Sequence, residues 1–284
     1  MQEFFSVSLI LTQHINRRLG RTPGVTLSKV SRYKREVSLE ENHHILLCDL
    51  GGTLGIDQEY IAPRNPSITA MNYMGYSFGV FNHQDMSNIS HLRRTMSFSK
   101  FPWMNCNITH PMTKEPFFGE PYEIYNINGM KLAILSGYGG SFRPEAENEH
   151  PTLHVSSLGN SVKRWLRYIY DTEDPDYVIV CISDADDEID TIVDDMEGVG
   201  LLITGSCEGE DLEENEYETF SIEDGQNIPR YHHHHTGKVM HVELSFKTRT
   251  TTYEFLNHSV ARIDREISQL SDDQRMLDLV HYHL

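Results

Sequence analysis

Short apolar runs alternate with amphipathic helical patterns along this chain, and this alternation limits the possible fold more than any other feature. Buried-strand signals occur at residues 45–48, 177–182 and 200–204, each a short apolar run bounded by turn-forming residues. Helical spacing of apolar side chains occupies residues 27–37 and 157–170. Strands that alternate with helices predict an α/β fold rather than an all-α or all-β one.

Further elements complete this pattern. A hairpin is predicted where two strands are joined by Asn128-Gly129, a dipeptide that favours the tight turns of β-hairpins. The other predicted strands are 5–12, 103–108, 122–127, 130–136, 238–246 and 250–255, and the other predicted helices are 66–74 and 260–282.

The charge distribution excludes one class of partner and suggests another. The chain of 284 residues has a formal net charge of -18, which argues against nucleic-acid binding because that requires clustered Lys and Arg. Between Arg167 and Arg230 there is no Lys or Arg, and half of the acidic residues lie there. The acidic region 171–224 is either a solvated face or a docking surface for a basic partner protein or for cations.

The cysteines and the N-terminus indicate a compartment. The four cysteines show no CxxC spacing, and Cys48 and Cys181 lie in predicted buried strands, where a free thiol acts as a small hydrophobe. Residues 1–12 lack a basic leader region, and their apolar run is too short to span a membrane. We therefore expect a cytoplasmic protein that does not enter a membrane.

The Asn82-His83 pair stands at the tip of a predicted short strand, where α/β proteins place their chemistry. The segment 68–85 resembles the helix, Leu-Gly-Tyr, strand, Gly-Asn-His-Glu block of calcineurin-like metallophosphoesterases, in the 5'-nucleotidase and 2',3'-cyclic phosphodiesterase branch. The resemblance implies a four-layer α/β/β/α sandwich with mixed sheets over residues 1–255. Residues 256–284 would form a helical tail, without the nucleotide-specificity domain that follows in the full-length family.

In that family two metal ions, bridged by a carboxylate, activate a water molecule, and their ligands come from several strand tips. At the first tip, His14 and Asn16 stand where the family has Asp and His. At the second, Gly52 stands where the bridging Asp belongs, and Asp49 lies three residues earlier.

The other tips are changed to different degrees. Asn82-His83 matches the family's metal ligand and its transition-state histidine, although Phe81 and Gln84 replace the flanking Gly and Glu. At the last two tips, residues other than His occupy the family's His positions: Asp184, Ser206 and Glu208.

These substitutions argue against a dinuclear centre and leave two alternatives. Either no metal binds, or one Mn²⁺, Fe²⁺ or Zn²⁺ is held by mixed nitrogen and oxygen ligands. The residues that could hold it are His14, Asn16, Asn82, Asp184 and Glu208, whereas Gly52 and Ser206 are lost positions.

We therefore predict a catalytically impaired metallophosphoesterase relative that acts as a binding or regulatory protein. The alternatives are a hydrolase of nucleotides or phosphodiesters with a rebuilt mononuclear site, in which His83 is the general acid, and a sensor that binds nucleotides or cations. The run His232-His233-His234-His235 is interpreted as a polar loop, with opportunistic metal binding as the alternative.

Overall fold

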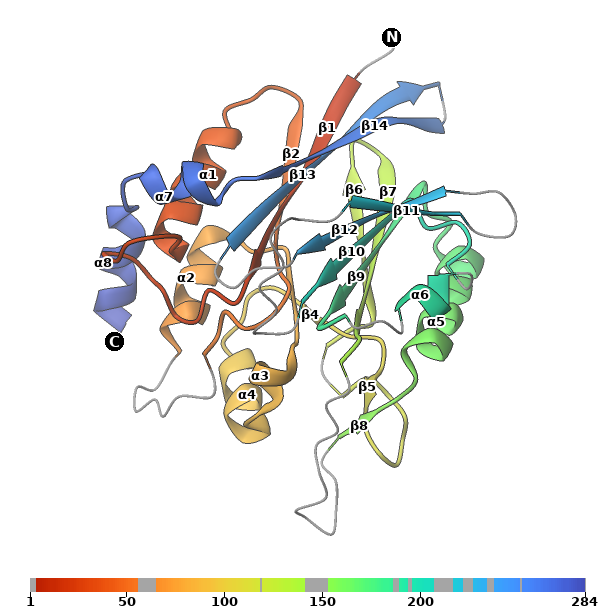
Figure 1. Ribbon diagram of the computed structural model, residues 1–284, viewed down its shortest axis with the longest axis horizontal. Helices are drawn as coiled ribbons and strands as arrows, with labels where there is room; N and C mark the ends of the chain where they lie inside the picture. Colours follow the sequence, from red (N-terminus) through yellow and green to blue (C-terminus); the bar gives the residue numbers. More distant parts are fainter. Residues whose placement is uncertain are drawn as a thin grey trace. The chain divides into compact units, whose positions relative to one another are not determined.

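The computed structural model describes residues 4–55, 65–117, 119–140, 153–185, 189–193, 196–206, 217–221, 227–233, 238–250 and 252–283. The chain folds into two compact units, each assembled from separate stretches of sequence (Figure 1). The first unit comprises Met1–Gly79, Gln84–Pro102 and His235–Leu284. The second unit comprises Val80–His83 and Trp103–His234.

The first unit is built on a mixed sheet whose central strand is β1 (Phe4–Gln13). Strand β1 runs parallel to β2 (His43–Asp49) and antiparallel to β13 (Lys238–Arg249). Strand β14 (Thr252–Arg262) extends the sheet beyond β13, and β3 (Phe78–Val80) extends it beyond β2, which gives the order β14-β13-β1-β2-β3. The carboxyl ends of β1 and β2 therefore lie at the same edge of this sheet.

The helices of the first unit begin and end where their capping residues allow. Helix α1 (Leu27–Val37) begins at Thr26, whose side chain accepts a hydrogen bond from the Lys29 N–H. Helix α2 (Pro66–Met74) begins at Asn65 and ends at Gly75, which takes the left-handed conformation with φ 66°. The remaining helices of this part of the chain are α3 (His83–Met86), α4 (Ile89–Met96), α7 (Asp264–Gln269) and α8 (Gln274–His283).

The second unit has its own mixed sheet, in the order β11-β12-β10-β9-β7-β6. Its middle is parallel, because β9 pairs with both β7 and β10 in that sense, whereas β6 and β11 are antiparallel to their neighbours. The strands are β6 (Tyr122–Ile127), β7 (Met130–Tyr138), β9 (Tyr177–Ser183), β10 (Leu201–Gly205), β11 (Tyr217–Ser221) and β12 (Asn227–His233). The short strands β5 (Ile108–Thr109) and β8 (His154–Val155) form a separate antiparallel pair, and β4 (Trp103–Met104) precedes them in the chain.

Helix α5 (Leu158–Thr172) covers one face of this sheet, together with the short α6 (Ile189–Ile192). Val162, Leu166 and Ile169 of α5 are fully or almost fully buried and pack with alternate residues of β7 and β9. Alternate residues of a strand point to the same face, so a single helix can bury one whole row of them.

Several predictions are confirmed. The helices predicted at 27–37 and 66–74 form with those bounds. The Asn128-Gly129 hairpin also forms, with positive φ at both residues. Cys48, Cys106 and Cys181 are buried free thiols, and the fold is mixed α/β with mixed sheets.

Three predictions are wrong in detail. The strand expected at 103–108 is split into β4 and β5, because the Asn105 side chain accepts hydrogen bonds from the backbone N–H groups of Asn107 and Ile108 and closes a turn. The helix expected from residue 260 is preceded by β14, which continues to Arg262. His232 and His233, expected in a loop, lie in β12, and His234 and His235 are outside the described residues.

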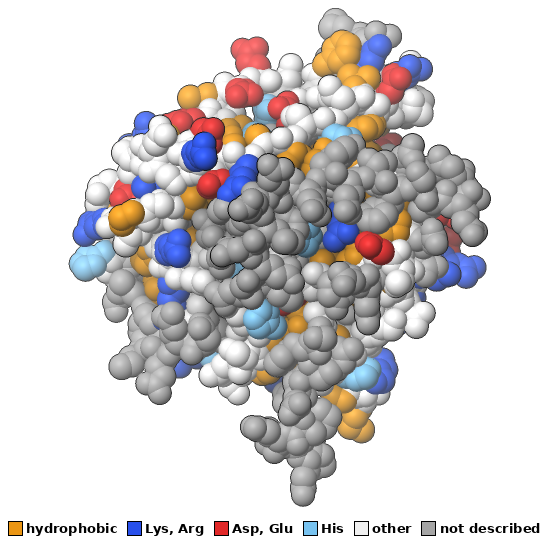
Figure 2. Space-filling model, viewed as in Figure 1, with side chains coloured by type: hydrophobic (Ala, Val, Ile, Leu, Met, Phe, Trp, Pro, Cys, Tyr) orange, Lys and Arg blue, Asp and Glu red, His pale blue; other side chains and the backbone are white. Residues whose placement is uncertain are grey.

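Two further observations concern the surface. On the face shown in Figure 2, Lys and Arg side chains are mixed with Asp and Glu side chains over the helices of the first unit. Among the described residues, no helix is both long enough and apolar enough to cross a membrane.

Candidate functional site

In the first unit, the loops that follow β1 and β2 run side by side. The His14 N–H donates to the Gly51 carbonyl at 2.9 Å, and the Asn16 N–H donates to the Gly52 carbonyl at 3.1 Å. All four of these residues have positive φ, so both loops leave their strands in the left-handed conformation. The structure thereby brings together three of the predicted positions, namely His14, Asn16 and Gly52.

A carboxylate that the sequence did not reveal meets Gly52. The Gly52 N–H donates to Asp85 Oδ2 at 3.0 Å, and Asp85 is buried. Next to it in sequence, Gln84 contacts His14, with 3.2 Å between Gln84 Oε1 and His14 Nδ1. Asp85 lies two residues after His83, and this proximity to the Asn-His pair was the only signal in the sequence that could have found it.

Asp49, three residues before Gly52, is completely buried in the protein. Its Oδ1 accepts hydrogen bonds from the hydroxyls of Thr12 at 2.7 Å and Thr53 at 2.5 Å, and its Oδ2 accepts one from the Gly51 N–H at 3.2 Å. Complete burial raises the pKa of this carboxyl to about 6, although the hydrogen bonds oppose the shift. Asp49 therefore fixes the shape of the two tips.

In the second unit, Asp184 holds His83. Asp184 Oδ2 accepts the His83 backbone N–H at 2.7 Å and lies 2.8 Å from His83 Nδ1. The Asp184 side chain is completely buried, whereas the His83 side chain is 35% exposed. Asp184 Oδ1 is buried and has no hydrogen-bond partner among the described residues. Asp184, predicted as a metal ligand, is thus hydrogen-bonded to the histidine of the Asn82-His83 pair.

Hydrogen bonds to neighbouring segments hold the backbone on both sides of Asp184 in place. Asp184 has φ 45°, an uncommon left-handed conformation for a residue other than glycine. The preceding Ser183 donates its hydroxyl to the Phe81 carbonyl, and the following Ala185 N–H donates to the Gly205 carbonyl at 2.8 Å. These bonds connect the tip of β9 with the segment that carries the buried Asn82 and with the tip of β10, after which Ser206 is buried.

The predicted positions therefore fall into two groups, His14, Asn16 and Gly52 in the first unit and Asn82, His83, Asp184 and Ser206 in the second. Glu208 lies outside the described residues. His232 is buried in β12, where its Nδ1 lies 2.5 Å from Thr204 Oγ1. This contact gives His232 a place in the packing of β10 against β12.

The donor set does not fit a two-metal centre. Gly52 has no side chain at the bridging position, and Ser206 replaces an imidazole with a neutral hydroxyl. Within the described ranges, no group of three or more His, Cys, Asp or Glu side chains is placed to hold a metal ion. For a single divalent ion, the candidate ligands stay those predicted from the sequence.

Comparison with solved structures defines the class of fold. The calcineurin-like phosphoesterase YfkN from Bacillus subtilis superposes with a TM-score of 0.73 at 15% identity, over 99% of this chain and 97% of that one. A 5'-nucleotidase precursor from Thermus thermophilus gives a TM-score of 0.75 at 13% identity, over 98% of this chain and 58% of that one. The chain has the fold of the calcineurin-like phosphoesterases.

Curated relatives point to one branch of this class. Protein UshA of Salmonella pullorum is 27% identical over 107 residues, which are 37% of this chain and 19% of that protein. A 2',3'-cyclic-nucleotide 2'-phosphodiesterase/3'-nucleotidase of Yersinia enterocolitica is 26% identical over 113 residues, 36% of this chain and 17% of that protein. The match thus spans less than a fifth of each relative's length. No protein-family model matches the chain.

Proposed function

We propose that this protein uses the phosphoesterase fold as a binding or regulatory scaffold and does not catalyse two-metal phosphoester hydrolysis. The main observation behind this proposal is the residue at the tip after β2, where Gly52 stands at the bridging position. A dinuclear centre needs a carboxylate that bridges both ions, and Gly52 offers only a backbone N–H, which is already donated to Asp85. The tip is stabilised by bonds within the protein.

The other replaced positions support the same conclusion. Asp184 accepts both N–H groups of His83, so one of its two carboxylate oxygens is already used. His14 contacts Gln84, a neutral amide at the place where the family pattern has a Glu. At these two ligand positions of the family pattern, the side chains of this protein, Asp184 and His14, therefore contact other protein side chains.

Metal content and phosphodiesterase activity, measured on the same preparation, test this proposal. We expect less than one equivalent of metal per chain by elemental analysis, and no turnover of bis-p-nitrophenyl phosphate or nucleotides when Mn²⁺ is added. A 5'-nucleotidase with an intact bridging Asp serves as the positive control. Metal-dependent turnover that disappears in His83→Ala would overturn the proposal.

A second candidate is a hydrolase with a single divalent metal, and the geometry of His83 favours it. A buried carboxylate orients the imidazole through Nδ1 while a third of the side chain stays exposed, an arrangement suited to a general acid. The ion would be held by His14, Asn16, Asn82, Asp184 or Glu208 and would supply a Lewis acid for the phosphoryl oxygens. This candidate predicts that Asp184→Asn lowers turnover while the protein still folds.

A cytoplasmic location and a basic protein partner are part of the proposal. The partner would bind the acidic region 171–224, because like charges there repel one another and a cationic surface would offset them. Binding of polylysine tests this: it should weaken steeply as salt is added. Equal binding by a protein in which the acidic residues of 207–216 are replaced by their amides would contradict it.

A further inference from the structure

The second unit contains a cavity of about 710 Å³, and none of the residues that line it belongs to the strand tips described above. Five consecutive residues, 120–124, line it, and the last three of them belong to β6. Successive side chains of a strand point to opposite faces of the sheet. A cavity that all of them touch must therefore lie along the edge of the strand, against its backbone.

Strand β6 is the last strand of its sheet in the part of the chain that the structure describes. It pairs with β7, and the Ser136 N–H donates to the Pro121 carbonyl at 3.1 Å. Ladder bonds alternate along an antiparallel pair, so the backbone groups of Tyr122 and Ile124 point away from β7. Within the described residues, neither has a backbone partner on that outer side. The cavity therefore presents unpaired N–H and C=O groups at strand spacing.

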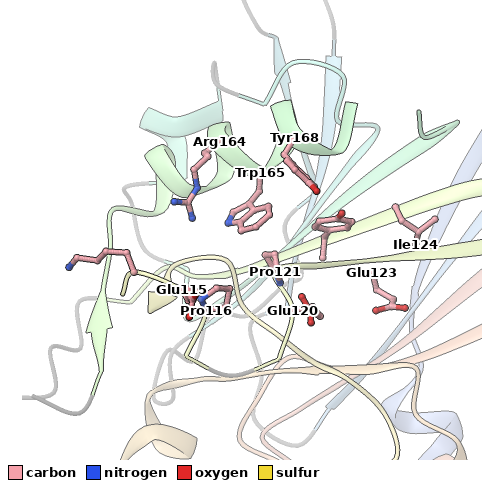
Figure 3. A pocket seen from close by; sticks show the side chains of 11 residues that line it. Glu115, Pro116, Glu120, Pro121, Glu123, Ile124, Arg164, Trp165 and Tyr168 are labelled. Carbon is pink, nitrogen blue, oxygen red and sulfur yellow. The ribbon is translucent and has the colours of Figure 1, made fainter. Parts of the chain in front are cut away.

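One wall of the cavity is aromatic. The rings of Tyr122, Trp165 and Tyr168 form a cluster with centroids 5.6 to 6.2 Å apart, and Tyr168 is 47% exposed. The Arg164 guanidinium lies 5.1 Å from the centre of the Trp165 ring. Figure 3 shows the side chains of Arg164, Trp165 and Tyr168 projecting from α5 on one side of the cavity. Such a wall favours apolar groups and already holds a cation.

The opposite side of the cavity is acidic. Figure 3 shows the carboxylates of Glu120 and Glu123 across from the α5 side chains. Neither carboxylate forms an ion pair with any described residue. Partial burial and then the neighbouring Glu120 raise the pKa of Glu123. A cation placed here would offset this repulsion.

We propose that the outer edge of β6 binds an extended segment of a partner protein, which adds to the sheet as a further strand. Successive side chains of an added strand face opposite sides of the sheet. Those on the α5 side would be apolar and contact the aromatic wall, and those on the other side would be Lys or Arg and contact Glu120 and Glu123.

A second copy of this chain fits the edge poorly. Two β6 strands placed edge to edge would bring Glu120 and Glu123 of both copies together, and like charges across a strand pair destabilise it. This inference rests on the proposed role of the protein as a binding scaffold. Its test involves neither metal nor hydrolysis, so the two proposals can fail separately.

The probe is a fluorescein-labelled peptide of alternating lysine and valine, with fluorescence polarisation as the measurement. A peptide of alternating glutamate and valine controls for charge. The lysine peptide with methylated backbone nitrogens keeps every side chain but cannot pair as a strand. We expect the unmethylated lysine peptide to bind at least about tenfold more tightly than either control. Amide hydrogen exchange should then slow at Tyr122 and Ile124.

Two variants locate the site. Glu123→Lys should weaken binding of the lysine peptide by roughly tenfold. The matched control Glu36→Lys makes the same charge change on the exposed surface of α1, outside the cavity and outside the acidic region 171–224, and should leave binding unchanged. Ile124→Pro removes an outward N–H without breaking a bond to β7, so it should abolish binding in a protein that still folds.

The inference would be overturned by equal binding of the glutamate or methylated peptide, by equal loss in both charge variants, or by exchange protection that falls outside 120–127. Concentration-dependent sedimentation that Glu123→Lys alters would assign the edge to self-association instead. Absence of binding by every peptide at millimolar concentration would also count against a strand-accepting edge.

Discussion

At the scale of single residues, Asp184 combines an uncommon backbone conformation with two charge-assisted contacts to His83. A strained backbone persists where surrounding bonds hold it in place. Asp184→Ala removes the acceptor for two N–H groups and keeps the strain, so it should lower the free energy of unfolding by about 2–4 kcal/mol. Asp184→Asn keeps one acceptor oxygen and should cost about half as much.

Urea denaturation monitored by fluorescence measures these differences. Asp184→Gly serves as the control for strain, because glycine adopts positive φ readily and should recover about 1 kcal/mol relative to Ala. If the Ala variant is as stable as the wild type, the contact between Asp184 and His83 is not part of the folded protein in solution.

Asp49 makes stability depend on pH. Its pKa is about 6 in the folded protein and near the ordinary 3.8 when unfolded, because burial disfavours the charged form. Between about pH 4 and pH 6 the folded state therefore holds a proton that the unfolded state has released. Stability falls as pH rises through this window, by roughly 3 kcal/mol at most, and the loss stops above it.

Asp49→Asn removes this titration while keeping an oxygen for the two threonine hydroxyls. We expect the wild type to lose stability relative to Asp49→Asn as pH rises from about 4 to about 7. Urea titrations of both proteins measure this difference, in which other titrating groups, such as His241 with its pKa lowered by burial, cancel. A difference that does not change with pH would contradict the raised pKa.

At the scale of elements, the approach of β4 to the start of β6 depends on Gly119. A Cβ atom there would lie 1.7 Å from the Trp103 carbonyl oxygen, and φ is +56°. Gly119→Ala must displace the backbone of β4 and should cost more than about 4 kcal/mol. Gly24→Ala is the matched control: it also has positive φ (+83°) but no atom within 4 Å, so about 1 kcal/mol is expected. Thermal unfolding distinguishes the two, and equal melting temperatures would contradict the close approach.

The sequence predicted elements best where the signals are local. Helices α1 and α2 were predicted with correct ends because Thr26, Asn65 and Gly75 are capping residues beside clear patterns. The continuation of β14 to Arg262 depends on pairing with β13, and such pairing is not encoded in local propensity. In the structure His14 and Asn16 contact the Gly52 loop, because β1 and β2 are neighbouring parallel strands. The contact of Asp184 with His83 joins residues far apart in sequence, so pattern reasoning did not find it.

At the scale of the whole molecule, residues from both ends of the sequence belong to the first unit. Helix α8 packs on α2 and α1, and Met276 and Val280 are buried. Asp273, just before α8, is buried as well. Its Oδ2 accepts from the Ser31 hydroxyl at 2.7 Å and from Arg35 Nη2 at 2.6 Å. One carboxylate thus attaches the C-terminal helix to α1.

We expect Asp273→Ala to lower the free energy of unfolding by about 2–4 kcal/mol, because it leaves the buried Ser31 hydroxyl without this acceptor and breaks the ion pair with Arg35. It also removes Oδ1, which accepts from the Met276 N–H at the start of α8. The exposed Asp278→Ala on α8 is the matched control and should change stability by less than about 0.5 kcal/mol. Urea denaturation provides the values, and hydrogen exchange should show faster opening of 274–283 in Asp273→Ala alone. If both variants behave alike, α8 is held by its apolar face and the carboxylate adds nothing measurable.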